Sequence, residues 1–405
     1  MKIVVGVLYS LLPEIVVFAI AALLAAQVST FPAAGRLAVE ISAAAILVAA
    51  LGLSVQFNRS RISFGLLTLI GAYLASFALS RLDDPVKRAI LDGGLCLMLP
   101  LDVLIFAFIP ERGVFSRYGG LWFGVLAGET LALWALTAFH SPLVAHALQV
   151  QFTQMKLLTH IDVSQPALLL IGLGLLCFND RLLWRHDAES AAFFLAMVCV
   201  LPVLHGSELA RSALFLGAAG LGFGYAVIQG SWSMAYLDEL TGLPGRRALE
   251  EQMRQLGGRY VIAMVDVDHF KHFNDRYGHD VGDQVLRFVA SRLQRPALLG
   301  KPFRYGGEEF CLLYSNRDLS QVKDELEQVR ADIESCRFDL RQGGRRNEDT
   351  GPGDPHTDML SITVSIGAAQ HGEHLDEPWT VLKAADKALY DAKHAGRNRV
   401  SLGGV

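Results

Sequence analysis

The sequence predicts a multi-span α-helical membrane domain followed by a soluble α+β domain. The first observation is an uneven distribution of charge. Residues 1–229 carry only 13 of the 36 Lys and Arg residues and 13 of the 40 Asp and Glu residues. A soluble domain is usually about a quarter charged, so the first part has a membrane-like composition and the rest an ordinary soluble one. The second observation is that long apolar runs fill the first part, whereas short strand-like and helix-like segments alternate after it. Together they exclude a single soluble domain, a disordered chain and a secreted disulfide scaffold.

Apolar stretches of roughly bilayer-spanning length recur through the first part. They lie at 3–26, 37–56, 62–80, 89–110, 119–139, 164–179, 189–206 and 209–229. The sixth is short, so seven spans is the alternative to eight. With eight spans, the loops on the side of the C-terminal domain carry 7 basic residues and those on the other side carry 6. The positive-inside rule then places the C-terminal domain in the cytoplasm.

Several ionisable residues lie within the predicted spans, where an ionised carboxylate is costly. Glu40 and Asp92 are near span ends, where their side chains can reach water. Asp102 and Glu129 lie deeper and are candidates for a ligand or proton-sensing pocket, and Glu14 is a further intramembrane acid. A protonated acid bonded to a neighbouring helix is the simpler alternative.

The two parts are joined by a short segment, residues 230–237, which is too short for a coiled-coil stalk. A helical linker there must continue the eighth span. The five cysteines form no CxxC pair, so we expect no disulfide and no zinc site. The C-terminal part is not basic, which argues against nucleic acid as a partner.

The C-terminal part alternates helix-like and strand-like segments, as in an α+β domain with a mainly antiparallel sheet. Helices are expected over 245–256, 281–294, 317–336 and 379–395. Strands are expected over 260–267, 301–305, 309–314, 361–369 and 399–401, with a hairpin at Gly306-Gly307. The polar segment 341–358 is rich in Gly and Pro and is expected to be a mobile loop.

Residues able to bind a metal and a nucleotide fall at four places in this part. Asp266 ends an apolar strand, and the acidic turn Gly306-Gly-Glu-Glu-Phe310 can meet it across the sheet. Two converging carboxylates favour Mg²⁺ bridging phosphate oxygens. Between these two places in the sequence, a predicted turn region carries hydrogen-bond donors and acceptors that suit the edge of a purine. Its residues are Lys271, Asn274, His279 and Asp283. Lys393 and Arg397, four residues apart on one helix face, suit a polyphosphate.

These motifs together identify a family. Residues 238–400 resemble the GGDEF domain of diguanylate cyclases. The matching motifs are Asp238-Glu-Leu-Thr-Gly-Leu-Pro, Asp266-Val-Asp-His-Phe-Lys, Asn274-Asp, Gly278-His279, Gly282-Asp283, Gly306-Gly-Glu-Glu-Phe310 and Ala385-Asp-Lys-Ala-Leu-Tyr390 followed by Ala395-Gly-Arg-Asn-Arg399. The sequence therefore divides into three predicted segments: a transmembrane sensor domain of about eight helices (1–229), a short helical linker (230–237) and a GGDEF domain (238–405). The resemblance itself covers only the last of them.

The resemblance implies a palm-like fold and the condensation of two GTP to cyclic di-GMP and two pyrophosphates in a homodimer. Together with the apolar spans of the first part, it predicts a multi-pass protein of the bacterial inner membrane, with the lipid bilayer and an unknown ligand of the membrane domain as partners. Mg²⁺ or Mn²⁺ is the implied cofactor. By the family pattern, Asp266, the Val267 carbonyl and Glu308 hold the metal, Glu308 also takes the hydroxyl proton, and Glu309 supports this set. The implied substrate-binding residues are Asn274 and Asp283 for guanine with His279 nearby, Lys271, Lys393 and Arg397 for phosphates, and Phe270.

Two departures from the family pattern are visible. Gly245 stands where the family usually has Asn, at an expected helix N-cap, with little expected effect. Many members carry an R-x-x-D product-inhibition site, but the equivalent stretch here is Ala297-Leu298-Leu299-Gly300. We therefore expect no feedback inhibition through that site. The alternatives to an active cyclase are a catalytically silent receptor for GTP or cyclic di-GMP, and a transporter with a regulatory tail.

Overall fold

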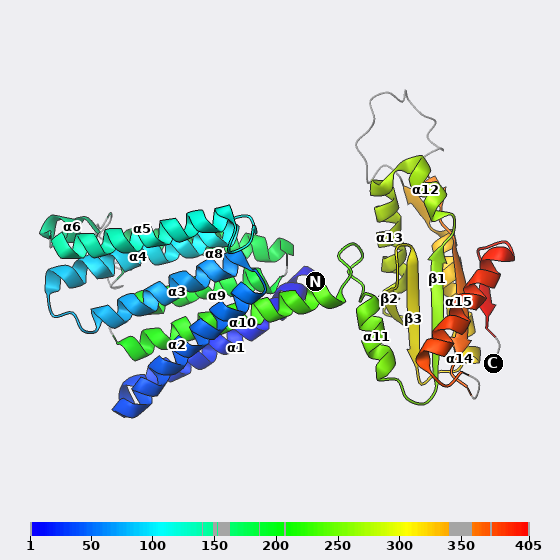
Figure 1. Cartoon of the computed structure of the whole chain (residues 1–405), viewed down its shortest axis with the longest axis horizontal. Coiled ribbons are helices and arrows are strands. Elements are labelled where there is room, and N and C mark those ends of the chain that lie inside the picture. Colours follow the sequence, from blue (N-terminus) through cyan, green and yellow to red (C-terminus); the bar gives the residue numbers. More distant parts are fainter. Residues whose placement is uncertain are drawn as a thin grey trace, which may run out of the picture. The chain divides into compact units, whose positions relative to one another are not determined.

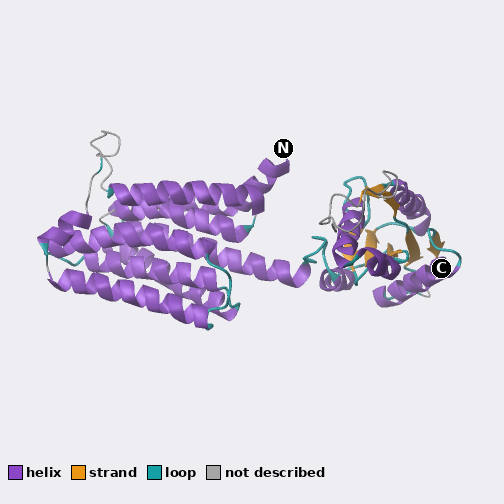
Figure 2. Ribbon diagram, turned by 90° about the horizontal axis from the view of Figure 1, so that it is seen from above, coloured by secondary structure: helices purple, strands orange, loops and turns teal. Residues whose placement is uncertain are grey.

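The computed structural model describes residues 2–139, 141–148, 152, 163–185, 187–205, 208–339, 359–372 and 375–403. The chain divides into two compact units, Met1–Ser231 and Trp232–Val405, which we call the helical unit and the C-terminal unit. All strands of the described residues lie in the C-terminal unit (Figures 1 and 2). The predicted loop at 341–358 lies outside the described residues.

The helical unit is a bundle of long helices. They are α1 (Lys2–Gln27), α2 (Ala33–Gln56), α3 (Ser60–Leu79), α4 (Pro85–Phe108), α5 (Arg117–Phe139), α6 (Pro142–Leu148), α8 (Gln165–Arg185), α9 (Ala188–His205) and α10 (Leu209–Tyr236), with a 3₁₀ turn at Val28–Thr30. Among the described residues, eight helices are long and apolar enough to cross a membrane. The sixth, α8, is longer than its predicted stretch, and the short α6 was not predicted. Large apolar side chains such as Leu23 and Leu176 are exposed on the outside of the bundle, which is compatible with a lipid environment.

The predicted deep acids Asp102 and Glu129 meet inside this bundle. Asp102 on α4 is 5% exposed and accepts a hydrogen bond from Thr68 Oγ1 of α3 at 3.4 Å. Glu129 of α5 is hydrogen-bonded to the same carboxyl group. Each of these carboxyl groups thus has a hydrogen-bond partner on a neighbouring helix. The simpler alternative, a protonated acid bonded to a neighbouring helix, requires such a partner.

The C-terminal unit is built on a mixed five-stranded sheet in the order β2-β3-β1-β6-β7. Its strands are β1 (Tyr260–Val267), β2 (Lys301–Arg304), β3 (Glu309–Ser315), β6 (Val364–Gln370) and β7 (Val400–Leu402). The β1–β3, β1–β6 and β2–β3 pairs are antiparallel and the β6–β7 pair is parallel. A separate antiparallel pair joins β4 (Arg337–Asp339) to β5 (Met359–Ser361), and it was not predicted.

Helices cover both faces of this sheet. They are α11 (Arg246–Arg254), α12 (Phe270–Tyr277), α13 (His279–Leu293), α14 (Leu319–Ser335) and α15 (Pro378–His394). Strand β1 is buried along its whole length because its alternate side chains enter two different cores. Val261, Ala263 and Val265 face the core with α13 and α14, whereas Ile262 and Met264 face the core with α11 and α15. By this alternation Asp266 lies on the α15 side.

Helix α12 corrects the predicted turn region. Residues 270–277 are helical, and Gly278 separates α12 from α13 with φ +84°. Glycine adopts this left-handed conformation without the steric cost that other residues incur. Helix α12 therefore replaces the expected turn, and together with α13, which was predicted over 281–294, it fixes the spacing between Asn274 and Asp283.

Candidate active site

The candidate site lies at one end of β1, where an acidic cluster forms around Asp266. Asp266 is 3% exposed, and it pairs across the sheet with Glu309 of β3. Directly paired residues point to the same face. Glu308 immediately precedes β3, and its carbonyl accepts a hydrogen bond from Val267 N at 3.3 Å. Three of the predicted catalytic residues are thus brought together by the β1–β3 pair.

Lys393 of α15 supplies the positive charge of the cluster. Its Nζ lies 2.8 Å from Asp266 Oδ2. The contact depends on how closely α15 approaches β6. A Cβ atom on Gly367 would lie 2.0 Å from Leu389 N and 2.3 Å from Ala385 O, so only glycine permits this packing. Lys393 is one helical turn beyond Leu389, and the close approach brings it to the end of β1.

The carboxyl groups of the cluster have raised pKa values, first of all because they are partly buried. Burial raises the pKa of Asp266, and the hydrogen bond from Lys393 offsets part of that rise. Burial followed by the Asp266 charge raises the pKa of Glu308 and of Glu309. Such groups favour either protonation or a nearby cation. The cluster therefore concentrates negative charge in a partly desolvated place.

Arg304 binds the backbone of the acidic turn at Gly306-Gly307. Its Nη1 donates to Asp238 Oδ1 at 2.7 Å and Oδ2 at 2.9 Å, and its Nη2 donates to Gly307 O at 2.7 Å. Its Nε donates to Gly306 O at 3.2 Å. Burial alone would raise the pKa of Asp238, but hydrogen bonds from Thr241 and Arg304 outweigh it and lower the value. One guanidinium thus links the segment after α10 to the turn that carries Glu308.

Asn274 has the features of a recognition residue. Its Oδ1 is buried and has no hydrogen-bond partner within the described part of the chain. Gly282 allows α13 to lie against it, since a Cβ there would lie 1.8 Å from this oxygen. Asp283 follows Gly282 and is half-buried. An unsatisfied buried acceptor costs free energy unless a ligand supplies a donor.

The remaining predicted residues take different positions. Lys271 and His279 are exposed, in the first turns of α12 and α13. Phe270 is 7% exposed and belongs to the core beneath these helices. Its predicted contact with substrate stays a prediction, and the structure gives it a packing role.

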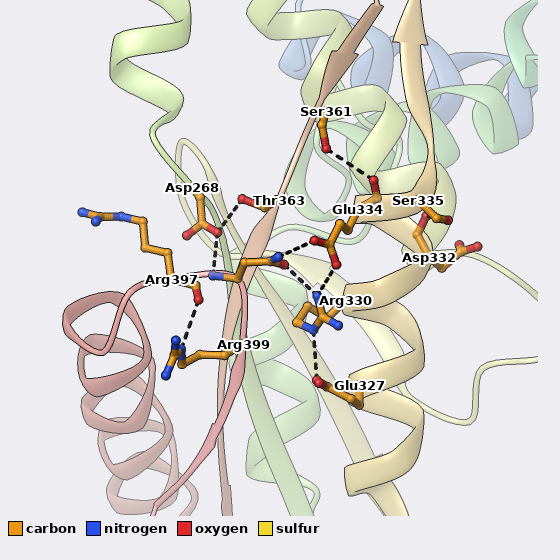
Figure 3. Close-up of polar contacts among 11 residues, drawn as sticks. Asp268, Glu327, Arg330, Asp332, Glu334, Ser335, Ser361, Thr363, Arg397 and Arg399 are labelled. Atoms are coloured by element: carbon orange, nitrogen blue, oxygen red, sulfur yellow. Dashed lines mark hydrogen bonds and ion pairs between the residues drawn. The ribbon is translucent and has the colours of Figure 1, made fainter.

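Arg397 lies in a tight turn after α15, beyond the helical face on which it was predicted. Arg397 and Asn398 have positive φ, as does Gly396. Left-handed non-glycine residues cost about 1 kcal/mol each, so other contacts must hold the turn. Figure 3 shows these contacts: Asp268 Oδ2 accepts from Asn398 N at 3.1 Å, and the Asn398 side chain bonds to Arg330 and Glu334 of α14.

Asp268 is the centre of that support, and sequence reasoning assigned it no role. Its carboxylate also accepts a hydrogen bond from Thr363 Oγ1 at 2.8 Å (Figure 3). A further hydrogen bond comes from Ser365 Oγ at 2.7 Å. Asp268 therefore anchors the turn that presents Arg397. Its position two residues after Asp266 was the available signal, but the partners come from distant segments.

Comparison with known proteins agrees with these observations. The family model described as "Diguanylate cyclase, GGDEF domain" matches residues 235–399. The response regulator PleD of Caulobacter vibrioides is 36% identical over 178 residues, covering 42% of this chain and 36% of its own length. Diguanylate cyclase DgcP of Pseudomonas aeruginosa is 40% identical over 178 residues, covering 42% of this chain and 24% of its own. The chain thus spans well under half the length of these two relatives.

Among solved structures, the GGDEF domain of DgcB from Caulobacter crescentus, in complex with c-di-GMP, is 36% identical. The match covers 42% of this chain and 93% of that one, with a TM-score of 0.36. The C-terminal unit therefore contains a GGDEF domain of the diguanylate cyclase type, over residues 235–399.

Proposed function

We propose that this protein is a membrane-bound diguanylate cyclase that condenses two GTP molecules to cyclic di-GMP and two pyrophosphates. The observation that carries the proposal is the convergence of Asp266, Glu308 and Lys393 at the acidic turn of a GGDEF domain. The relatives named as diguanylate cyclases support it. All the residues that the family pattern requires for metal and substrate are present.

The donor set fits Mg²⁺ or Mn²⁺. Asp266 and Glu308 offer hard carboxylate oxygens, and the rise in their pKa values reflects a charge that a divalent cation would neutralise. Within the described residues, no three Asp, Glu, His or Cys side chains could hold a metal ion on their own. The Val267 carbonyl and the phosphates of the substrate would then complete the site. When bound, the cation neutralises phosphate charge and lowers the pKa of the attacking hydroxyl.

The residues of the chain then have separate tasks. Asn274 Oδ1 accepts from the guanine edge, and Asp283 accepts from the same base. Lys271, Lys393 and Arg397 hold the phosphates. Glu308 accepts the proton of the 3′-hydroxyl, whose oxygen bonds to the α-phosphorus of the other GTP as the bond to pyrophosphate breaks. Two such transfers close the ring, which requires two protomers facing each other across a twofold axis.

We also propose that product does not inhibit through the stretch 297–300. Glu325 Oε1 of α14 accepts from Leu299 N at 3.0 Å and Gly300 N at 3.3 Å. A Cβ on Gly300 would lie 2.5 Å from Cζ of Tyr314. An aspartate could not stand at position 300 without displacing that ring, which supports the absence of an R-x-x-D site.

The test is product formation by the full-length protein in nanodiscs with GTP and Mg²⁺, resolving cyclic from linear product by mass. Glu308→Ala is the inactive variant, and Glu251→Ala, an exposed acid of α11, is the matched control. Product in the wild type and control, and none in Glu308→Ala, is the expected result. Normal product in Glu308→Ala would refute the assignment. GTP binding without product in the wild type would favour the silent receptor.

A further inference from the structure

Glu14 of α1 is buried in the helical unit without a partner. The residue is 2% exposed. Neither Oε1 nor Oε2 has a hydrogen-bond partner among the residues that the structure describes. This distinguishes it from Asp102, which is bonded to Thr68 and Glu129. A buried carboxyl group without a partner costs several kcal/mol if it is ionised, so it requires a separate explanation.

The carboxyl group lies against the helix that leads to the C-terminal unit. A Cβ on Gly222 of α10 would lie 3.8 Å from Glu14 Cδ and Oε1, and 2.8 Å from Leu195 Cδ2 of α9. The absence of a side chain at Gly222 therefore brings the carboxyl group close to the α10 backbone. Helices α1 and α10 lie side by side in Figure 1. Any change in size or hydration of the carboxyl group acts directly on α10.

The titratable groups on the neighbouring helices do not neutralise Glu14. On α9, Glu189 and His205 lie in the first and last turns, and Glu189 pairs with Arg61 and Arg181. On α10, Arg211 is in the first turn, 11 residues or about 16 Å along the axis from Gly222.

Four further groups lie nearer to Glu14 along the bundle or belong to α8. Tyr225 of α10 accepts a hydrogen bond from Gln229, and Cys199 of α9 is a buried free cysteine. Asp180 and Arg181 of α8 lie near that helix's end. Of the side chains that the structure describes on these helices, none supplies a counter-charge to Glu14.

The cation that such a site can hold follows from its chemistry. Metal cations such as Mg²⁺ and Ca²⁺ require six or more oxygen ligands, and a single carboxyl group in an apolar pocket cannot supply them. A proton requires only the carboxyl group itself. We propose that Glu14 is a proton-binding site of the helical unit, and that loss of the proton shifts α10.

The local structure of α1 allows such a response. Pro13 precedes Glu14 within the helix and removes one backbone hydrogen bond of α1. The helical turn that carries Glu14 can therefore move when the carboxyl group ionises and becomes hydrated. The link to activity rests on the proposed function, whereas proton binding does not.

Proton binding is tested on the full-length protein in nanodiscs by pH-difference infrared spectroscopy. The carbonyl stretch of a protonated carboxyl group should appear in the wild type on acidification and be lost in Glu14→Gln. Asp102→Asn is the matched control, since it removes another buried acid of the bundle and should retain the Glu14 band. A spectrum that is the same in wild type and Glu14→Gln at every pH would overturn the site.

The effect on α10 is tested by cyclic di-GMP formation across the same pH range. The activity ratio of wild type to Glu14→Gln should change by about 5-fold or more through the titration seen in the infrared. A constant ratio would overturn the coupling while leaving the proton site in place. If neither protein forms product, the proposed function fails, and the infrared result still decides whether Glu14 binds a proton.

Discussion

The contact between Arg304 and Asp238 should couple the stability of the C-terminal unit to its catalytic rate. Arg304 and Asp238 have side chains that are 14% and 24% exposed, and their N–O distances are 2.7 and 2.9 Å. Hydrogen bonds to charged groups contribute about 1.5–3 kcal/mol, less where water screens them. We therefore expect a coupling free energy of about 1.5 kcal/mol between the two residues.

Replacing Arg304 should cost more than replacing Asp238, because Arg304 also donates to the carbonyls of Gly306 and Gly307. At about 1 kcal/mol for each of these bonds, Arg304→Ala should destabilise the unit by about 3–4 kcal/mol and Asp238→Asn by about 1–2 kcal/mol. The turn also carries Glu308, and a displacement of about 1 Å at a reacting group can cost about 100-fold in rate. A fall of 10- to 100-fold in kcat is expected for Arg304→Ala.

The assay is a double-mutant cycle on the full-length protein, with thermal unfolding and product formation measured on the same samples. Arg304→Lys is the control, since it keeps the charge but cannot bond to both Asp238 and the two carbonyls. Effects of Arg304→Ala and Asp238→Asn that add within about 0.5 kcal/mol would refute the coupling. An unchanged kcat in Arg304→Ala would refute the positioning of the turn.

Three further predictions concern the same unit. The pKa of Glu308 in the folded protein lies above its ordinary value of 4.5. The metal-free protein should therefore gain stability as the pH falls toward 4.5. For the same reason Glu308→Gln should raise the melting temperature at neutral pH by about 2 °C, which scanning calorimetry can test. Asp268→Ala leaves three hydrogen-bond donors without an acceptor. It should lower the free energy of unfolding by about 3 kcal/mol, against about 1 kcal/mol for Asp268→Asn. An equal loss of amide-exchange protection at Asn398 in the two variants would contradict this. Added cyclic di-GMP should leave initial rates unchanged at micromolar concentrations, and a submicromolar inhibition constant in the wild type would refute the inference from Gly300.

The sequence predicted the strands and the long helices because each has a strong local pattern. Strand β1 is apolar up to Asp266 near its end, and the turn at Gly306-Gly307 marks the β2–β3 hairpin. The prediction from sequence failed at α12, because polar residues followed by a glycine are equally typical of a turn. Strands β4 and β5 are three residues each, too short for a periodicity to show.

The site residues were found by type and spacing, but their contacts were not. The four-residue spacing of Lys393 and Arg397 suggested one helix face. In the structure the helix ends at His394, and Arg397 occupies a left-handed turn that Asp268 stabilises. The Lys393–Asp266 contact depends on the close packing at Gly367, which is a property of tertiary structure. For the same reason the sequence could not separate Glu14 from the other acidic residues of the helical unit.

Lys393 has two competing partners in the proposed reaction, and this has a consequence for the order of binding. Its ammonium group neutralises Asp266 at 2.8 Å, yet the family pattern assigns it to phosphate. A lysine moved from Asp266 to a phosphate would leave a carboxyl group that is 3% exposed and close to two further acids. That loss is acceptable only if another cation replaces it at Asp266, since an uncompensated buried charge costs about 3–5 kcal/mol. Metal and triphosphate should therefore bind together, with Lys393 moving from the carboxylate to the phosphate as they do.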